Sequence, residues 1–272
     1  MIKMIVCDLD GTLLAGKSNI PEENIAALRR AMDAGVQVVI ASGRMIEATV
    51  PIAEKIGVNG PLSLFNGAMA YDYQSDRILC GTTIPHAAIL PVIEALEARG
   101  TYVQAFPGRG YYMEKKNHWT DYYENKINVL GTEVGMPLSQ WLKTDVFKLL
   151  CLDEPGELDK IIREFSPLFP EVTFVKSGET HLEVVATGVD KASGMADISR
   201  LTGIAPEEMI AFGDEMNDLP MLKYAGTGYA MENAVPGVLK EMRLIAPKNT
   251  DHGVARIVNM YLDEGRMGGN AQ

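Results

Sequence analysis

The stretch Lys3-Met4-Ile5-Val6-Cys7-Asp8-Leu9-Asp10-Gly11-Thr12 decides the fold, because an apolar run ends there in two aspartates and a glycine. Residues 3–9 form a mainly apolar and partly β-branched run, so they predict a buried strand that Gly11 closes. Asp8 and Asp10 stand two residues apart, and in an extended segment such residues point to the same side. The sequence therefore predicts two neighbouring carboxylates at the end of a buried strand.

The same order of strand, polar loop and helix returns in the first and last thirds of the chain. We expect further apolar strands at residues 36–41, 62–65, 209–212, 229–231 and 244–246. Helices are expected at residues 21–34, 45–56, 191–202, 219–225, 236–241 and 251–262, with Pro51 as a kink. Strands that are apolar throughout and alternate with helices are typical of a parallel sheet covered on both faces.

The middle third follows another pattern. Short runs at residues 101–106, 110–114, 145–152, 172–176 and 181–186 predict strands, with helices at 87–99 and 156–169. Several of these runs alternate apolar and polar residues, as strands with one covered face do. The fold class is therefore α/β: a doubly wound, mostly parallel, Rossmann-like sheet with an inserted α+β cap domain. We expect residues 1–82 and 188–272 to form the core, 83–187 the cap, and the Gly-rich residues 264–272 a disordered tail.

Composition narrows the class of protein. The 272 residues suit one core domain plus a smaller one, and the net charge of −11 argues against a general nucleic-acid binder. Cys7, Cys80 and Cys151 are widely spaced, which favours a reducing compartment. The sequence has no signal-peptide pattern and no run of about 20 apolar residues. We expect a cytoplasmic protein without membrane partners, a monomer rather than a dimer.

A second acidic cluster favours a functional role for Asp8 and Asp10. A lone Asp-x-Asp is more often a solvated turn, but Gly213-Asp214-Glu215-Met216-Asn217-Asp218 also follows an apolar strand. Ligands of open α/β sheets collect at the carboxyl ends of strands. Close carboxylates repel one another, and a hard divalent cation such as Mg²⁺ relieves that repulsion. Asp214 can complete such a site, although Asp214 or Asn217 can also cap the helix that follows.

Two further positions suit an anion. Ser42-Gly43-Arg44 follows the second strand and opens a helix, where a hydroxyl and backbone N–H groups can bind phosphate. A plain Ser N-cap explains the same residues equally well. Lys191 also begins a helix, where a cation is unfavourable unless a negative group lies near. The alternative for Lys191 is a solvated surface side chain.

Taken together, these motifs resemble those of the haloacid dehalogenase-like hydrolases. The resemblance rests on four motifs in order, namely Asp8-Leu9-Asp10-Gly11-Thr12-Leu13-Leu14, Ser42-Gly43-Arg44, Lys191, and Gly213-Asp214-Glu215-Met216-Asn217-Asp218. The ending Asn249-Thr250-Asp251-His252-Gly253-Val254-Ala255 is similar to that of the Cof-type subfamily, which carries a large cap between its second and third motifs. The resemblance covers nearly the whole chain, whereas the cap matches only in length and pattern.

The resemblance implies a magnesium-dependent phosphatase that forms an aspartyl-phosphate on Asp8. Asp10 would act as general acid and then general base. Mg²⁺ would be held by the carboxylates of Asp8 and Asp214 and by the backbone carbonyl of Asp10. Phosphate contacts would come from Ser42, Lys191, Asn217 and backbone N–H groups near Leu9, Asp10 and Gly43.

Other residues have supporting roles in this hypothesis. Asp218 could pair with Lys191, Arg44 could reach the substrate or lie on the surface, and Asn66 could face the cap or form a plain turn. His181 and Glu183 share one face of a predicted cap strand and are candidates for substrate specificity.

Three functions stay open at this point. The first is a phosphatase acting on a sugar phosphate or a phosphorylated cofactor. The second is a phosphosugar mutase of the same superfamily, and the third is a non-catalytic phospho-receiver or binding protein. The complete set of Asp10, Ser42, Lys191 and Asp214 argues against the third. The identity of the small phosphorylated substrate depends on the cap, where the sequence offers no decisive motif.

Overall fold

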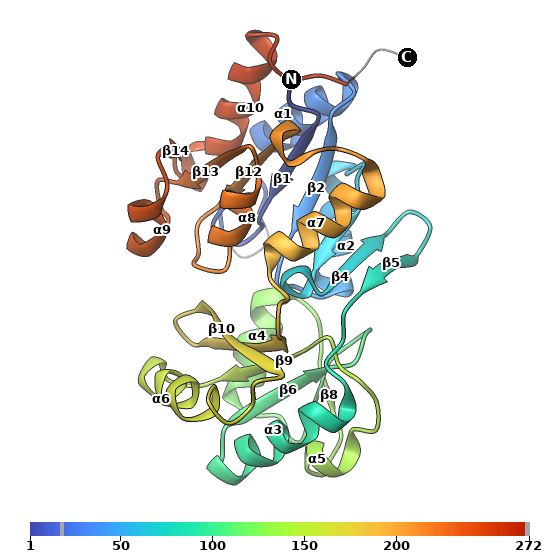
Figure 1. Ribbon diagram of the computed structural model, residues 1–272, viewed down its shortest axis with the longest axis vertical. Helices are drawn as coiled ribbons and strands as arrows, with labels where there is room; N and C mark the ends of the chain where they lie inside the picture. The colour runs from blue at the N-terminus through green and yellow to red at the C-terminus, as the bar shows by residue number, and fades with distance from the viewer. Residues whose placement is uncertain (17–18, 270–272) are drawn as a thin grey trace. The chain divides into compact units, whose positions relative to one another are not determined.

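The computed structural model describes residues 1–16 and 19–269 (Figure 1), and by its contacts the chain divides into two compact units. The first unit contains residues 1–43, 49–80 and 190–272, and the second contains residues 44–48 and 81–189. The long insertion of the second unit thus runs from residue 81 to 189, against the expected 83 to 187. None of the helices in the described ranges is both long enough and apolar enough to cross a bilayer.

The first unit is built on one large sheet. Its strands are β1 (Met4–Cys7), β2 (Gln37–Ala41), β3 (Leu62–Leu64), β4 (Met69–Asp72), β5 (Arg77–Gly81), β12 (Met209–Gly213), β13 (Thr227–Met231) and β14 (Leu244–Ala246). The eight strands lie in the order β14-β13-β12-β1-β2-β3-β4-β5. Pairing is parallel from β14 to β3 and antiparallel between β3 and β4. The α/β prediction with a mostly parallel core sheet is confirmed.

Helices alternate with these strands along the chain. They are α1 (Glu22–Asp33), α2 (Ile46–Ile56), α7 (Lys191–Thr202), α8 (Leu219–Tyr224), α9 (Pro236–Glu241) and α10 (Gly253–Asp263), with short 3₁₀ turns η1 (Phe65–Gly67), η2 (Pro206–Glu208) and η3 (Asn249–Asp251). Met4 and Val6 of β1 join a core with Met195 and Ile198 of α7. Because strand side chains alternate, Ile5 faces the opposite side, and it is fully buried too. Both faces of β1 are therefore covered.

The end of the chain corrects one expectation. Residues 264–269 were expected to be disordered because they are rich in glycine, yet Met267 is buried and forms a bridge with Ile2. The N–H of Gly268 donates to the carbonyl of Ile2, and the N–H of Gly269 donates to that of Ala34. Glycine permits this close approach to a neighbouring backbone. Residues 270–272, also part of the expected tail, lie outside the described residues.

The second unit is an antiparallel sheet with helices. Its strands are β6 (Tyr102–Phe106), β7 (Tyr112–Met113), β8 (Thr132–Glu133), β9 (Lys148–Leu152), β10 (Val172–Gly178) and β11 (His181–Ala186), in the order β10-β11-β9-β6-β7-β8. Its helices are α3 (His86–Arg99), α4 (His118–Ile127), α5 (Leu138–Trp141) and α6 (Pro155–Phe165). Only β7 and β8 pair in parallel, so this unit is α+β as expected.

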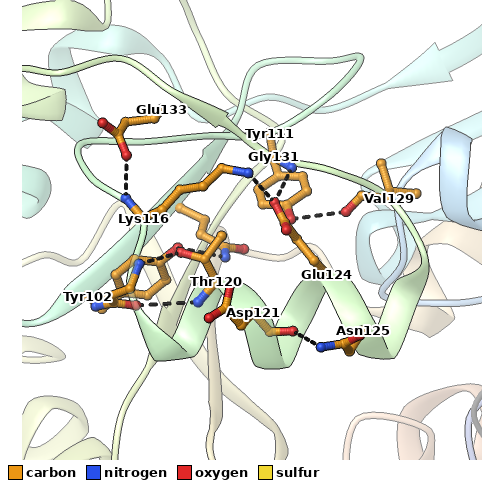
Figure 2. Close-up of polar contacts among 12 residues, drawn as sticks. Tyr102, Tyr111, Lys116, Thr120, Asp121, Glu124, Asn125, Val129, Gly131 and Glu133 are labelled. Carbon is orange, nitrogen blue, oxygen red and sulfur yellow. Dashed lines mark hydrogen bonds and ion pairs between the residues drawn. The ribbon is translucent and has the colours of Figure 1, made fainter.

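Polar contacts hold α4, which the sequence did not predict, in place (Figure 2). Asn117 caps the helix, and the hydroxyls of Tyr102 and Thr120 share a hydrogen bond of 2.6 Å. Glu124 accepts hydrogen bonds from the Lys116 ammonium at 2.7 Å and from the Gly131 N–H at 2.9 Å. The aromatic residues of α4 are only moderate helix formers. These contacts therefore stabilise a helix whose intrinsic helix propensity is modest.

Candidate active site

Asp8 lies directly beyond the carboxyl end of β1. Its N–H donates to the carbonyl of Phe212 at the end of β12, which continues the sheet pairing by one residue. The chain then folds back, because the N–H of Leu13 donates to the carbonyl of Asp8 and that of Leu14 to the carbonyl of Leu9. We call residues 8–14 the nucleophile loop. Asp8 is only 6% exposed, whereas Asp10 on the same loop is partly exposed.

Gly11 lets the nucleophile loop touch the loop after β12. Its φ is +83°, and a Cβ at this position would lie 2.2 Å from Oδ2 of Asp214. Any larger residue would therefore displace that carboxylate. The next residue, Thr12, is fully buried and donates from Oγ1 to Oδ1 of Asp214 over 2.7 Å. This hydrogen bond fixes Asp214 beside Asp8.

Lys191 supplies the positive charge of the site. It is the first residue of α7, whose N-cap Asp190 accepts a hydrogen bond from the N–H of Ser193. Its ammonium lies 2.5 Å from Oδ1 of Asp8 and 2.5 Å from Oδ1 of Asp218. Burial disfavours the ammonium, but the two carboxylates outweigh burial and raise the pKa of Lys191 above its ordinary value. Lys191 is therefore a buried, charged partner of the acidic cluster.

Asp218 shapes the loop that carries Asp214. Its Oδ1 accepts from Lys191, and its Oδ2 accepts from the backbone N–H groups of Asp214 at 2.8 Å and Glu215 at 2.9 Å. Gly213 is needed beside it, because a Cβ there would lie 2.5 Å from the Asp218 Cβ. Both carboxylate oxygens of Asp218 are thus engaged in positioning Lys191 and Asp214.

The carboxylates of this site carry more negative charge than one lysine can balance. Burial, followed by the charges of Asp218 and Asp10, raises the pKa of Asp8 to about 7 against the opposing effect of Lys191. Burial and the charges of Asp8 and Asp218 raise the pKa of Asp214 to about 9. Raised pKa values in a cluster of buried acids mark a place where a cation or a proton must be held.

The donor set fits Mg²⁺. One carboxylate oxygen each from Asp8, Asp214 and Asp218 lies within 4.8 Å of the others. Hard oxygen donors of this kind are what Mg²⁺ selects. Because the two oxygens of Asp218 already accept three hydrogen bonds, the better ligands are the carboxylates of Asp8 and Asp214. The same residues were chosen from the sequence, together with the backbone carbonyl of Asp10.

The predicted phosphate-binding residues gather around the same strand ends. Ser42 is buried after β2, and its carbonyl accepts from the N–H of Asn66 at 3.1 Å. The side chain of Asn217 donates to Oδ1 of Asn66 over 3.0 Å. Asn66 has a φ of +57° and is 2% exposed, and its Nδ2 has no hydrogen-bond acceptor among the described residues. A buried donor of this kind is available to a ligand oxygen.

The remaining predicted residues have other surroundings. The side chain of Leu9 is fully buried, so only its backbone can bind a ligand, and Gly43 ends the first segment of the first unit. Arg44 is buried and belongs to the second unit. His181 and Glu183 also lie in the second unit, where Glu183 accepts from Lys148 and Ser177, both at 2.8 Å. The Glu183 carboxylate is thus held within its own unit.

Thr12 belongs to the first motif, but its role in the site is not evident from the sequence. The position of Thr12 directly after the Gly11 turn does indicate that its side chain can reach a neighbouring loop. What the sequence could not show is that this loop carries Asp214, since the two residues stand 202 positions apart.

Comparisons with known proteins point to one family. A family model described as haloacid dehalogenase-like hydrolase matches residues 5–258. The chain is 30% identical to the 5-amino-6-(5-phospho-D-ribitylamino)uracil phosphatase YcsE of Bacillus subtilis, over 96% of each chain. It is 26% identical to the pyridoxal phosphate phosphatase YbhA of Escherichia coli, over 96% of this chain and 98% of the relative. A haloacid dehalogenase-like hydrolase from Bacteroides thetaiotaomicron superposes with a TM-score of 0.86 at 28% identity, covering 96% of this chain and 99% of the other.

Proposed function

Because the chain belongs to the haloacid dehalogenase-like hydrolases and is a phosphatase of phosphate monoesters, we propose that it hydrolyses a small phosphorylated metabolite through an aspartyl-phosphate on Asp8. The observation that carries the proposal is the buried Asp8 carboxylate, held by Lys191 at 2.5 Å and clustered with Asp214. Such a carboxylate is a positioned nucleophile whose charge is kept in place by a fixed cation.

In the first step, one oxygen of Asp8 attacks phosphorus and the bond to the ester oxygen breaks. Asp10 is partly exposed and stands two residues away on the same loop. In its protonated form it gives a proton to the leaving oxygen, so that the alcohol departs neutral. In the second step, the Asp10 carboxylate takes a proton from water, which attacks phosphorus and breaks its bond to Asp8. Inorganic phosphate leaves, and both aspartates return to their starting states.

The surroundings stabilise the charge on the transferring group. Lys191 contributes a fixed ammonium, and Ser42, Asn66, Asn217 and the backbone N–H groups of the nucleophile loop contribute hydrogen-bond donors. Donors held in place before the reaction stabilise developing charge without reorganising. Asp8, Asp214 and the carbonyl of Asp10 would hold Mg²⁺, which would neutralise negative charge on the phosphoryl oxygens.

The substrate class follows from the chemistry of the site and from the relatives. The site recognises a phosphoryl group, and the relatives named above act on phosphorylated small molecules that contain a nitrogen heterocycle. We therefore propose a sugar phosphate or a phosphorylated cofactor or its precursor as substrate.

The test is phosphate release from a broad panel of phosphorylated metabolites, with the wild-type protein and Asp8→Asn compared in Mg²⁺ and in excess chelator. We expect multiple turnovers by the wild-type protein in Mg²⁺, loss in chelator, and no turnover by a folded Asp8→Asn variant. Near-normal turnover by that variant would remove Asp8 as nucleophile, and full activity in chelator would remove the metal. A mutase would return isomerised phosphate ester, and a phospho-receiver would release at most one equivalent.

A further inference from the structure

The motif at residues 249–255, near the end of the chain, has no place in the proposed chemistry, yet it contacts the nucleophile loop. The side chain of Asn249 donates from Nδ2 to the carbonyl of Leu14 over 2.7 Å. Its own N–H donates to Oδ1 of Asn233 over 3.0 Å. Asn233 in turn donates from Nδ2 to the carbonyl of Gly11 over 2.8 Å. Two asparagines thus hold the loop at two points and hold each other.

A third asparagine acts from the other side of the motif. Asn24 of α1 is fully buried and donates from Nδ2 to the carbonyl of Leu13 over 3.3 Å. Its Oδ1 accepts from the N–H of Ala255 in α10 at 3.0 Å. Gly253, between Asn249 and Ala255, allows this arrangement, because a Cβ there would lie 1.9 Å from the carbonyl oxygen of Pro247.

All three side chains donate a hydrogen bond from their NH₂ group to a carbonyl of the nucleophile loop. In Asn24 and Asn233, the NH₂ group donates to a loop carbonyl while the oxygen accepts a backbone N–H from another segment. Asn249 also donates to the loop, and its Oδ1 accepts the N–H of Thr250 at 3.0 Å. Aspartate has no donor to offer, and alanine has neither donor nor acceptor, so neither residue can make the hydrogen bond to a loop carbonyl.

We propose that Asn24, Asn233 and Asn249 form an asparagine clamp that positions the nucleophile loop for catalysis. The loop carbonyls of Gly11, Leu13 and Leu14 flank Thr12, the residue that fixes Asp214 beside Asp8. Holding these carbonyls fixes the separation between Asp8, Asp10 and Asp214. The three asparagines are positioning residues, because they act through the backbone of the loop and through Thr12. The inference rests on the proposed function, since it assigns them a role in that reaction.

The chain contains a matched control at the opposite end of the sheet. Asn59 accepts the N–H of Val38 at 2.8 Å and donates to the carbonyl of Val36 over 3.1 Å. It therefore holds backbone by both ends of its amide, as the clamp residues do. Val36 and Val38 stand at the amino end of β2, whereas the site lies at the carboxyl ends of the strands. Replacing Asn59 removes the same kind of contact without reaching the nucleophile loop.

The experiment compares Asn233→Ala, Asn249→Ala and Asn24→Ala with Asn59→Ala, using p-nitrophenyl phosphate and Mg²⁺. The clamp predicts that kcat falls about 10- to 100-fold in the first two variants while KM changes little, because small displacements of reacting groups carry costs of that size. Asn59→Ala should lower the melting temperature and leave kcat unchanged. Asn233 is exposed, so its variant keeps the test valid even if Asn24→Ala does not fold.

Two outcomes would overturn the clamp. The first is a wild-type kcat in Asn233→Ala and Asn249→Ala. The second is a fall in kcat in Asn59→Ala as large as theirs, which would mean that kcat simply follows stability. If the wild-type protein itself released no phosphate from any ester, the proposed function would fail first, and the clamp with it.

Discussion

Each unit buries a lysine among polar groups, and the two clusters differ in their balance of charge. In the first unit, Lys191 faces both Asp8 and Asp218, and Asp214 stands beside them. Three buried carboxylates share one ammonium. In the second unit, the Lys148 ammonium pairs with the carboxylate of Glu183 at 2.8 Å. The second oxygen of Glu183 accepts from the hydroxyl of Ser177, and the Lys148 ammonium lies 4.8 Å from the centre of the Phe106 ring.

This difference separates a reactive cluster from a structural one. A pair of opposite charges that also satisfies its hydrogen bonds requires no additional ion. Removing one partner of the pair lowers the free energy of unfolding. A cluster with excess negative charge raises the pKa of its acids and creates a demand for a cation. Burial of a lysine therefore does not by itself mark a functional site; the unbalanced carboxylates beside Lys191 do.

The largest effect on kcat should come from replacing Lys191, the buried lysine of the first unit. Lys191→Met takes away the cation that holds Asp8 and that faces the transferring phosphoryl group. We expect kcat to fall about 100- to 1,000-fold, the size seen when one fixed stabilising group is lost from such a site. Steady-state kinetics with p-nitrophenyl phosphate measure this fall. A loss of less than about tenfold would contradict the assignment of Lys191 to the reacting charge.

The corresponding change in the second unit should act on stability. Lys148→Met removes the ammonium that pairs with the buried Glu183, while Ser177 still donates to the other carboxylate oxygen. We expect this change to cost about 3–5 kcal/mol in the free energy of unfolding. The double variant Lys148→Met/Glu183→Leu removes both charges and should recover most of that loss. Urea unfolding of the three proteins tests this. If the double variant were no more stable than Lys148→Met, charge balance would not explain this cluster.

The pH dependence of stability should report on the acidic cluster of the first unit. The folded protein holds the Asp214 proton up to about pH 9, whereas the ordinary pKa is 3.8. Its stabilising effect is therefore fully present below pH 3.8 and is lost as the pH rises toward about 9. In chelator, the free energy of unfolding should decrease over this range, and Asp214→Asn should flatten the decrease. Added Mg²⁺ should restore stability at high pH, because it binds the ionised acids of the folded state. If the free energy of unfolding of Asp214→Asn decreased with pH as steeply as that of the wild-type protein, the proposed excess of negative charge at this site would be wrong.

A smaller effect is expected at the contact between the two loops of the core site. Thr12→Val keeps the shape of the side chain but removes the hydrogen bond to Asp214. We expect a cost of about 1 kcal/mol in stability and a modest fall in kcat. Raising the Mg²⁺ concentration should not restore kcat to the wild-type value if Thr12 positions Asp214. Full recovery would instead indicate that Thr12 affects only metal affinity.

The core could be predicted from the sequence because its signals are local. Each strand from β1 to β3 and from β12 to β14 is apolar and is followed by a helix or polar loop, so the parallel sheet and the order of Asp8, Ser42, Lys191 and Asp214 could be predicted together. The hairpin partners β4 and β5 were missed, since Tyr73-Gln74-Ser75-Asp76 gives only a weak turn signal. β5 is an edge strand and β4 lies next to it, and neither strand carries the site.

The asparagines and the second unit show where sequence reasoning stops. Asn24 stands on the buried face of an amphipathic helix, which is a visible anomaly, but its partners Leu13 and Ala255 are 11 and 231 residues away. Helix α4 depends on contacts that are distant in sequence, such as the hydrogen bond between Tyr102 and Thr120. Long-range hydrogen bonds of this kind leave no periodic pattern in the sequence.

The central claim is that Asp8, within its unbalanced acidic cluster, becomes covalently phosphorylated. The most direct measurement is to quench the Asp10→Asn variant during turnover of p-nitrophenyl phosphate with Mg²⁺, because p-nitrophenolate departs without a general acid and the first step can proceed. The acyl phosphate is then reduced with borohydride, and the modified residue is located by mass spectrometry. Without Asp10 to activate water, the intermediate should accumulate, and the label should fall on Asp8 alone. Phosphate release without a label on Asp8, or a label on another residue, would contradict the account.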